Sequence, residues 1–218
     1  MISCYHLTID GVARETPLLD DVTVELDDGD WTEFVGPTGA GKSLLYSVFA
    51  LELRPTDARL IVAGRNLQKL DAQGFAQLRR QIGTCRQVPE FLEERSVIEN
   101  LVLPLVVRGE TNRAAEVGER LLETAGCFEL RDRPVCDLSA GQRRLIGMLR
   151  AAIGTPRGVF VDGGLDGLTG DSEAAARRAL RDANEEGSTV VLFGREPSNV
   201  QATDAEMYRV EAGQVEPA

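Results

Sequence analysis

Short apolar runs alternate along this chain with segments of helical periodicity. Residues 31–35, 158–162 and 189–193 form largely apolar runs, which are typical of strands buried on both faces of a parallel sheet. Strand-like segments also cover residues 1–34 and 59–66, on either side of a glycine-rich loop. This alternation of strands and helices predicts an α/β fold.

Helical spacing of the apolar residues predicts the remaining elements. It indicates helices over residues 71–81, 96–125, from about 139 to 153, and 173–186. The last of these is charged and rich in alanine, as expected for a helix on the surface of a sheet. A turn at Ala212 and Gly213 within residues 207–215 predicts a closing hairpin.

The glycine-rich loop between residues 31–35 and the helix that follows carries the candidate chemistry. It matches the pattern G-x-x-x-x-G-K-[ST] in full and consists of Gly36, Pro37, Thr38, Gly39, Ala40, Gly41, Lys42 and Ser43. The glycines allow backbone N–H groups to wrap a polyphosphate, Lys42 adds positive charge, and the Ser43 hydroxyl is suited to Mg²⁺. A chance glycine turn with a lysine is the alternative, expected in on the order of one chain in a hundred. Because a strand and a helix flank the loop, the sequence predicts a nucleotide-binding site.

Four further motifs follow this loop. Gln87 comes after residues 79–83, residues 96–105 read SVIENLVLPL, and Asp162 ends an apolar run. The fourth motif consists of Leu138, Ser139, Ala140, Gly141 and Gln142. In this order and spacing, the motifs resemble those of the nucleotide-binding subunit of an ATP-binding cassette (ABC) system, whose signature is usually written L-S-G-G-Q. Residues 96–105 resemble the T-V-x-E-N-V-x-L-P-L stretch of the branch that contains the FtsE, LolD and MacB ATPases.

The resemblance covers essentially the whole chain and implies its organisation. It implies a P-loop NTPase fold of the ABC cassette type, with a RecA-like core, an N-terminal antiparallel β subdomain and an inserted helical subdomain. Residues 1–218 are expected to form one domain, in which 1–87 and 155–218 make the β subdomain and core and 88–154 the helical subdomain. Proteins of this branch act as dimers beneath a membrane partner. The expected partners are a permease-like or FtsX-like membrane subunit and a second cassette, in a homodimer or a heterodimer, at the cytoplasmic face of the cell membrane.

The resemblance also implies roles for individual residues. Residues 36–43, Gln87 and Asp162 are expected to bind ATP, and Ser43, Gln87 and Asp162 to hold its Mg²⁺. The signature residues 138–142 are expected to contact ATP that the opposite subunit holds, through the Ser139 hydroxyl and the dipole of the helix that begins there. Taken alone, residues 138–141 are equally well explained as an ordinary helix N-cap.

Two departures from the family affect the hydrolysis of ATP. Gly163 follows Asp162, where the family has the glutamate that orients the attacking water. General-base assistance of this kind is worth about 10²–10⁴ in rate. Arg195 stands where the family has its switch histidine, and His6, the one histidine of the sequence, lies far from that position. The sequence therefore predicts a site that holds Mg²⁺-ATP and cuts it slowly.

Three further departures concern the edges of the site. Residues 10–12 lack the aromatic ring that the family stacks on adenine, which predicts reduced affinity or relaxed base preference. Thr169 stands where the last acidic residue of the family's D-loop belongs, and Ala140 replaces a signature glycine.

Composition and charge exclude several classes of function. The formal net charge of −11 and the pI of about 4.7 oppose binding to nucleic acid or to anionic lipid. We expect no membrane span and no signal peptide, because the longest apolar region, residues 101–107, is broken by Pro104 and the chain begins with a strand-like segment. The cysteines lack C-x-x-C spacing and are expected to be buried free thiols.

Three functions remain open from the sequence. The first is a degenerate ATP-binding subunit, either in a homodimer with two weak sites or in a heterodimer whose competent site is completed by Ser139. The second is an active ATPase that uses another water-positioning group, such as Glu90 or Glu196. The third is a structural protein that no longer uses nucleotide, against which the intact Lys42 and Ser43 argue.

Overall fold

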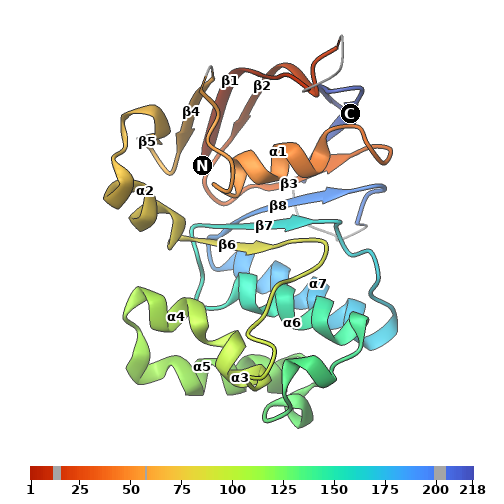
Figure 1. Ribbon diagram of the computed structural model, residues 1–218. Coiled ribbons are helices and arrows are strands. Elements are labelled where there is room, and N and C mark those ends of the chain that lie inside the picture. The colour runs from red at the N-terminus through yellow and green to blue at the C-terminus, as the bar shows by residue number, and fades with distance from the viewer. Residues whose placement is uncertain (12–15, 57, 199–204) are drawn as a thin grey trace.

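Two β-sheets and three groups of helices form the layers of the computed structural model (Figure 1). It describes residues 1–11, 16–56, 58–198 and 205–218. The strands are β1 (Ile2–Ile9), β2 (Leu19–Leu26), β3 (Trp31–Val35), β4 (Arg59–Val62), β5 (Arg65–Asn66), β6 (Ile82–Cys85), β7 (Gly158–Asp162), β8 (Thr189–Gly194), β9 (Glu206–Glu211) and β10 (Gln214–Pro217). The helices are α1 (Lys42–Phe49), α2 (Ala72–Arg79), α3 (Val97–Leu101), α4 (Leu103–Arg108), α5 (Thr111–Thr124), α6 (Ala140–Ala152) and α7 (Gly170–Glu185).

The larger sheet has the strand order β10-β9-β3-β8-β7-β6, and β9 to β6 run parallel. The smaller sheet is antiparallel, with the order β2-β1-β4-β5. Figure 1 shows α1 between the two sheets, α6 and α7 on the opposite face of the larger sheet, and α3, α4 and α5 in a further layer below. The α/β fold that the sequence predicts is confirmed.

Side chains that alternate along the parallel strands fill two separate cores. Phe34, Phe160 and Phe193 point towards α1 and the smaller sheet, where they are fully buried. Val159 and Val161 point to the other face, towards α6 and α7. Because neighbouring strand residues face opposite sides, a continuous apolar run serves both cores.

The structure differs from the sequence prediction in three places. The predicted helical stretch 96–125 is divided into α3, α4 and α5, because Pro104 lies in the first turn of α4 and Gly109, with φ +86°, ends that helix. Burial in the run 31–35 includes two polar side chains, Thr32 and Glu33, where burial on both faces of a parallel sheet predicts apolar ones. Cys136 is an exposed thiol rather than a buried one, because it lies in the surface turn before α6, whereas the other cysteines are buried.

Candidate functional site

The register of the larger sheet brings the predicted motifs to one edge. Val35 of β3 pairs with Gly194 of β8, and Asp162 of β7 pairs with the preceding Phe193. Cys85 of β6 pairs with Val161, so that β3, β8, β7 and β6, four of the five parallel strands, end side by side. The glycine-rich loop follows β3, and Arg195 follows β8. Gly163 follows β7, and Gln87 lies in the loop after β6. This edge is the position at which ligands bind in open parallel sheets.

A cleft of about 390 Å³ lies at this edge. It is lined by Leu18, Thr38, Gly39, Gly41, Lys42, Ser43, Leu44, Gln87, Asp162, Gly163, Asp166, Phe193, Gly194 and Arg195. Most of the residues that the sequence assigns to ATP binding therefore line one cavity. Gly36, Pro37 and Ala40 belong to the same loop and do not line it.

Lys42 is the central positive charge of the cleft. Its side chain comes from the first residue of α1, and its Nζ donates hydrogen bonds to the carbonyl oxygens of Gly36 and Pro37, at 2.7 and 2.8 Å. Burial lowers the pKa of this ammonium group, while Asp162 raises it. The two carbonyl bonds hold Lys42 along its own loop, within the cavity where a phosphate would lie.

Ser43 and Asp162 lie opposite each other across the cleft. The Ser43 hydroxyl donates to Oδ1 of Asp162 at 3.1 Å. Burial raises the pKa of the Asp162 carboxyl, and hydrogen bonds from Ser43 and from the Gly163 N–H lower it. With the amide oxygen of Gln87, these groups form an all-oxygen donor set, which suits Mg²⁺. Among the described residues there is no cluster of three or more His, Cys, Asp or Glu side chains that could hold a metal ion.

Gly163 has a backbone conformation that favours glycine. Its φ is +80°, in the left-handed region, and a Cβ atom there would lie 3.0 Å from Cγ of Gln87 and 3.3 Å from an Nη atom of Arg144. A side chain at this position therefore meets both backbone strain and crowding. Glycine therefore suits this position, and a larger residue would be disfavoured there.

Asp166 is a cleft residue that the sequence analysis did not assign to the site. Its Oδ2 accepts a hydrogen bond from Nε of Arg195 at 3.1 Å, and both side chains are partly exposed. Arg195 thus enters the cleft as expected, already paired with a carboxylate. The signal in the sequence was the position of Asp166 four residues after Asp162, and in the structure the Asp166 N–H donates to the carbonyl oxygen of Gly163 in the turn between them.

The signature residues lie apart from this cleft. Ser139 is the N-cap of α6, where its hydroxyl accepts from the Gln142 N–H at 3.2 Å and Gln142 Oε1 accepts from the Ser139 N–H at 3.0 Å. None of residues 138–142 lines the cleft of its own chain. Ser139 is exposed at the start of a 13-residue helix, and among the described residues its side chain bonds within the first turn of that helix.

Four other residues considered from the sequence do not line the cleft or lie outside the described residues. Val12, in the segment predicted to lack the adenine-stacking ring, lies outside the described residues. Thr169 precedes α7 as its N-cap residue and does not line the cleft. Glu90 lines a neighbouring cavity of about 420 Å³ and is highly exposed, whereas Glu196 lines neither cavity.

The fold and this cleft define a P-loop nucleotide-binding protein of the cassette type. The sequence profile of the family described as ABC transporter matches residues 19–164, and the chain belongs to that family. The dimeric structure of the ATP-binding cassette MJ0796 bound to ADP and Pi superposes with a TM-score of 0.89 at 22% identity, and covers 99% of this chain and 97% of that one. The predicted P-loop NTPase fold, with its antiparallel β subdomain, is confirmed.

Curated relatives with similar sequences are named methionine import ATP-binding proteins. MetN of Cupriavidus metallidurans is 33% identical over 207 residues, which cover 94% of this chain and 60% of that protein. MetN of Rhizobium meliloti is 32% identical over 199 residues, which cover 90% and 56%. The chain spans about 60% of the length of these relatives. Their names do not include FtsE, LolD or MacB, so the assignment to that branch stays a prediction. Among the described residues, no helix has the length and apolar character needed to span a membrane.

Proposed function

We propose that this chain is the ATP-binding subunit of an ABC-type membrane complex, with weak or absent hydrolysis. Mg²⁺-ATP binds the loop 36–43, with Gln87 and Asp162 at the metal, and favours closure of a dimer in which Ser139 of the opposite subunit completes the site. The observation that carries the proposal is the composition of the cleft. Lys42, Ser43 and Asp162 lie in one cavity, while residue 163 is a glycine held at φ +80°.

Charge in the cleft supports binding over hydrolysis. Lys42 and Arg195 both line it and can attract a triphosphate, and the guanidinium fork suits phosphate oxygens. The carboxylate that orients water in the family has no counterpart at residue 163. Loss of that assistance is expected to slow hydrolysis by about 10²–10⁴.

A second candidate, an active ATPase, is favoured by Asp166 rather than by Glu90 or Glu196. Asp166 contributes a carboxylate to the cleft itself. Its ion pair with Arg195 holds that carboxylate at 3.1 Å, so it would have to leave Arg195 to orient water. We therefore place this candidate second.

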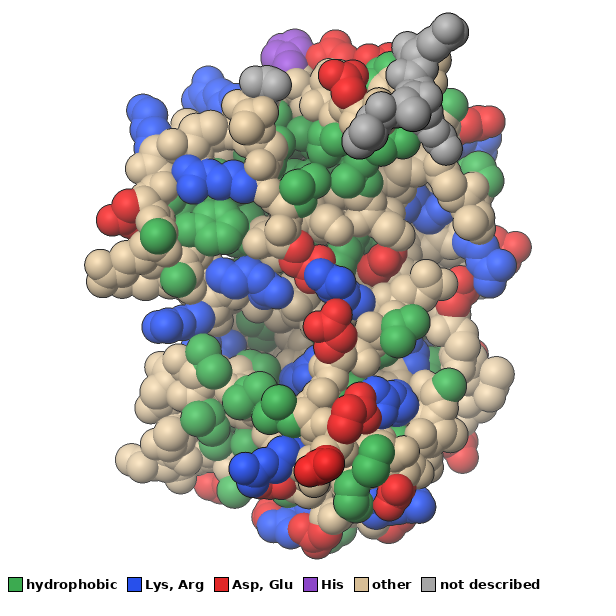
Figure 2. All heavy atoms as spheres, in the orientation of Figure 1, with side chains coloured by type: hydrophobic (Ala, Val, Ile, Leu, Met, Phe, Trp, Pro, Cys, Tyr) green, Lys and Arg blue, Asp and Glu red, His purple; other side chains and the backbone are tan. Residues whose placement is uncertain are grey.

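The membrane partner is expected to dock on the helical side of the molecule. Val88, Leu92, Val106 and Val107 are exposed apolar side chains there. Figure 2 shows hydrophobic side chains with Lys or Arg side chains over the region of α2 and α4. Residues 96–105 favour an FtsX-like partner, whereas the names of the curated relatives favour an import permease. Either partner would place this chain at the cytoplasmic face of the membrane.

The test is nucleotide binding and phosphate release by the purified chain. We expect fluorescent ATP with Mg²⁺ to bind the wild type and Lys42→Ala to weaken that binding by about 100-fold or more, since the principal charge on the phosphates is lost. Lys69→Ala is the matched control, because Lys69 is the other lysine of the sequence and is exposed at the end of a short 3-10 helix.

Three outcomes separate the candidates. Binding with phosphate release near background supports the proposal. Rapid release that Asp166→Asn abolishes would instead establish the active ATPase. No binding by the wild type, or equal binding by Lys42→Ala, would leave a structural protein that does not use nucleotide.

A further inference from the structure

Arg144 is a buried cation next to the cleft that no part of the proposed site uses. It lies on α6, two residues after the signature, and only 4% of its surface is exposed. Among the described residues, its hydrogen bonds go to backbone carbonyls and a thiol, with no carboxylate among them, and its Nε has no partner. The nearby Asp162 carboxylate interacts electrostatically with Arg144 without accepting a hydrogen bond from it. Burial of a charge is costly, so the contacts that Arg144 makes with backbone carbonyls need an explanation.

The two Nη atoms of Arg144 bind different loops of the cleft. One donates to Sγ of Cys85 at 3.4 Å and to the carbonyl oxygen of Arg86, immediately before Gln87. The other donates to the carbonyl oxygens of Asp162 and, at 2.8 Å, Gly164, on either side of Gly163. A single guanidinium thus joins the loop of Gln87 to the loop of Asp162. Its planar set of donors makes this possible, whereas a lysine offers one ammonium group.

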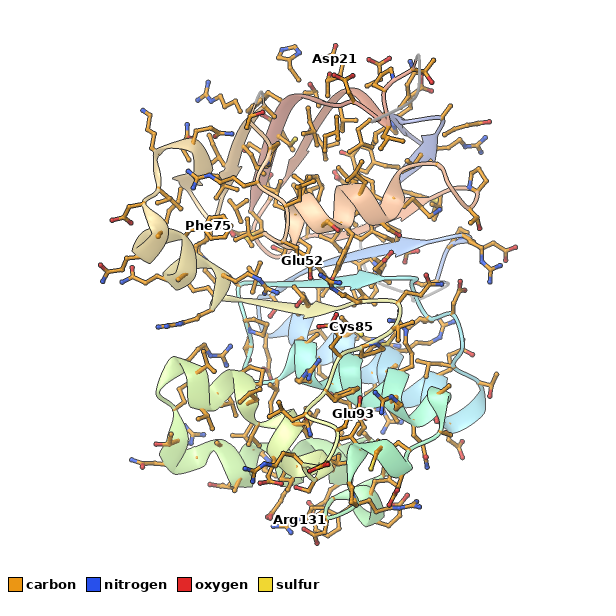
Figure 3. The ribbon with its side chains drawn as sticks, viewed as in Figure 1. Asp21, Glu52, Phe75, Cys85, Glu93 and Arg131 are labelled. Atoms are coloured by element: carbon orange, nitrogen blue, oxygen red, sulfur yellow. The ribbon has the colours of Figure 1, made fainter. Side chains whose placement is uncertain are left out.

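Close packing holds the Gln87 loop against the same face of α6. A Cβ atom at Gly147 would lie 2.6 Å from Cγ of Pro89, and one at Gly83 would lie 1.7 Å from the carbonyl oxygen of Ala151. Residues 144, 147 and 151 follow helical spacing, so this face of α6 meets β6 and the loop after it. Cys85, the last residue of β6 and labelled in Figure 3, directs its side chain towards α6.

The neighbouring arginines of α6 make contacts of another kind. Arg143 forms an exposed ion pair with Glu93, at 2.6 Å, and donates to the carbonyl oxygen of Val135. Arg150 donates to the carbonyl oxygen of Glu90. Neither of these contacts joins both loops of the cleft. The bridging position belongs to Arg144.

We infer that Arg144 is a positioning residue, which fixes Gln87 and Asp162 relative to each other and to the helix that carries Ser139. This role rests on the proposed function, because it concerns the Mg²⁺-ATP site of that proposal. Its consequence is that ATP affinity depends on Arg144 mainly through the metal. The phosphate contacts of Lys42 come from α1, which Arg144 does not contact through any hydrogen bond among the described residues.

The experiment compares the affinity of the full chain for ATP in Mg²⁺ and in EDTA. In Arg144→Lys and Arg144→Gln, we expect the enhancement of ATP affinity by Mg²⁺ to fall by about 10-fold or more, as for other residues that orient metal ligands. Affinity in EDTA should change less than about threefold. Arg143→Gln, at the adjacent, half-buried position of the same helix, should leave both affinities unchanged, because Arg143 bonds to Glu93 and Val135 and not to the loop of Asp162. A melting curve for each variant establishes that it is folded at the assay temperature.

Several results would overturn the inference. A wild-type Mg²⁺ enhancement in folded Arg144→Lys would mean that charge alone suffices. An equal loss in Mg²⁺ and in EDTA would indicate a general structural role, as would the same loss in Arg143→Gln. If Arg144→Gln is unfolded, Arg144→Lys decides, and if both are unfolded the residue is structural and the inference fails. Absence of ATP binding in the wild type is a different result, which would remove the proposed function itself.

Discussion

Individual residues determine whether this cleft can support nucleotide binding, hydrolysis, or both. Lys42, Ser43 and Asp162, to which the proposal assigns Mg²⁺-ATP binding, all line the cleft. At residue 163 there is no side chain, the backbone has φ +80°, and a Cβ atom there would lie close to Gln87. Replacing glycine with glutamate at this position would therefore add strain together with the carboxylate.

Substitutions at Gly163 and Gly167 can separate the effect of backbone strain from the effect of side-chain crowding. Both have φ near +80°, but a Cβ at Gly167 would meet nothing within 4 Å. We expect Gly163→Ala and Gly167→Ala each to lower the free energy of unfolding by about 1–2 kcal/mol through left-handed strain. Only Gly163→Ala should also weaken Mg²⁺-ATP binding, because its methyl group presses on Gln87. Urea unfolding and ATP titration measure the two effects, and equal ATP affinities in the two variants would contradict this account.

At the scale of elements, α6 combines a structural and a functional role at its first turn. Ser139 and Gln142 form a capping box, with each side chain bound to the backbone N–H of the other. The same serine is the residue that the family resemblance assigns to the phosphate of the opposite subunit. The two interpretations of residues 138–141, as cap and as signature, are therefore compatible.

Two substitutions at Ser139 separate these roles. We expect Ser139→Ala to lower the free energy of unfolding by about 1 kcal/mol, because the cap is lost. Ser139→Asp should retain the cap and most of the stability, yet oppose dimer formation with ATP, because a carboxylate would face a phosphate. Ser96→Ala removes the equivalent capping box of α3 and is the control for stability alone. If Ser139→Asp dimerises with Mg²⁺-ATP as well as the wild type does, the signature role is wrong.

The whole molecule carries enough charge to affect its own association. Each chain has a formal net charge of −11, so two copies repel each other over distances of about one Debye length, about 10 Å at 0.1 M salt. In the proposed dimer, Mg²⁺-ATP would add bridging contacts between the loop 36–43 of one chain and residues 138–142 of the other. The balance between these effects depends on ionic strength.

Sedimentation velocity can measure this balance. With Mg²⁺-ATP, we expect the dimer fraction to increase between about 0.05 and 0.3 M salt, because screening reduces repulsion between the acidic chains. With Mg²⁺-ADP, which lacks the terminal phosphate, the chain should remain mostly monomeric at the same concentrations. A dimer that dissociates as salt rises would show that ion pairs, rather than shared nucleotide, hold the two copies together.

The sequence was sufficient to predict the features that depend on local pattern. The apolar runs and helical spacing predicted β3, β7, β8, α6 and the closing hairpin, since burial on one or both faces imposes these periods. The glycine-rich loop lines the cleft at Thr38, Gly39, Gly41, Lys42 and Ser43, and its assignment to phosphate binding stays a prediction. The division of residues 96–125 into three helices was missed, although Pro104 and Gly109 were visible signals.

Other features depend on contacts between distant parts of the chain. The pairing of Asp166 with Arg195, the bridge from Arg144 to two loops and the left-handed backbone of Gly163 became apparent only in the folded molecule. Local sequence thus determined which groups can bind phosphate, because that chemistry lies within one loop. The tertiary structure decided how carboxylates and guanidinium groups are arranged around it, because the order of strands in the sheet sets which loops meet.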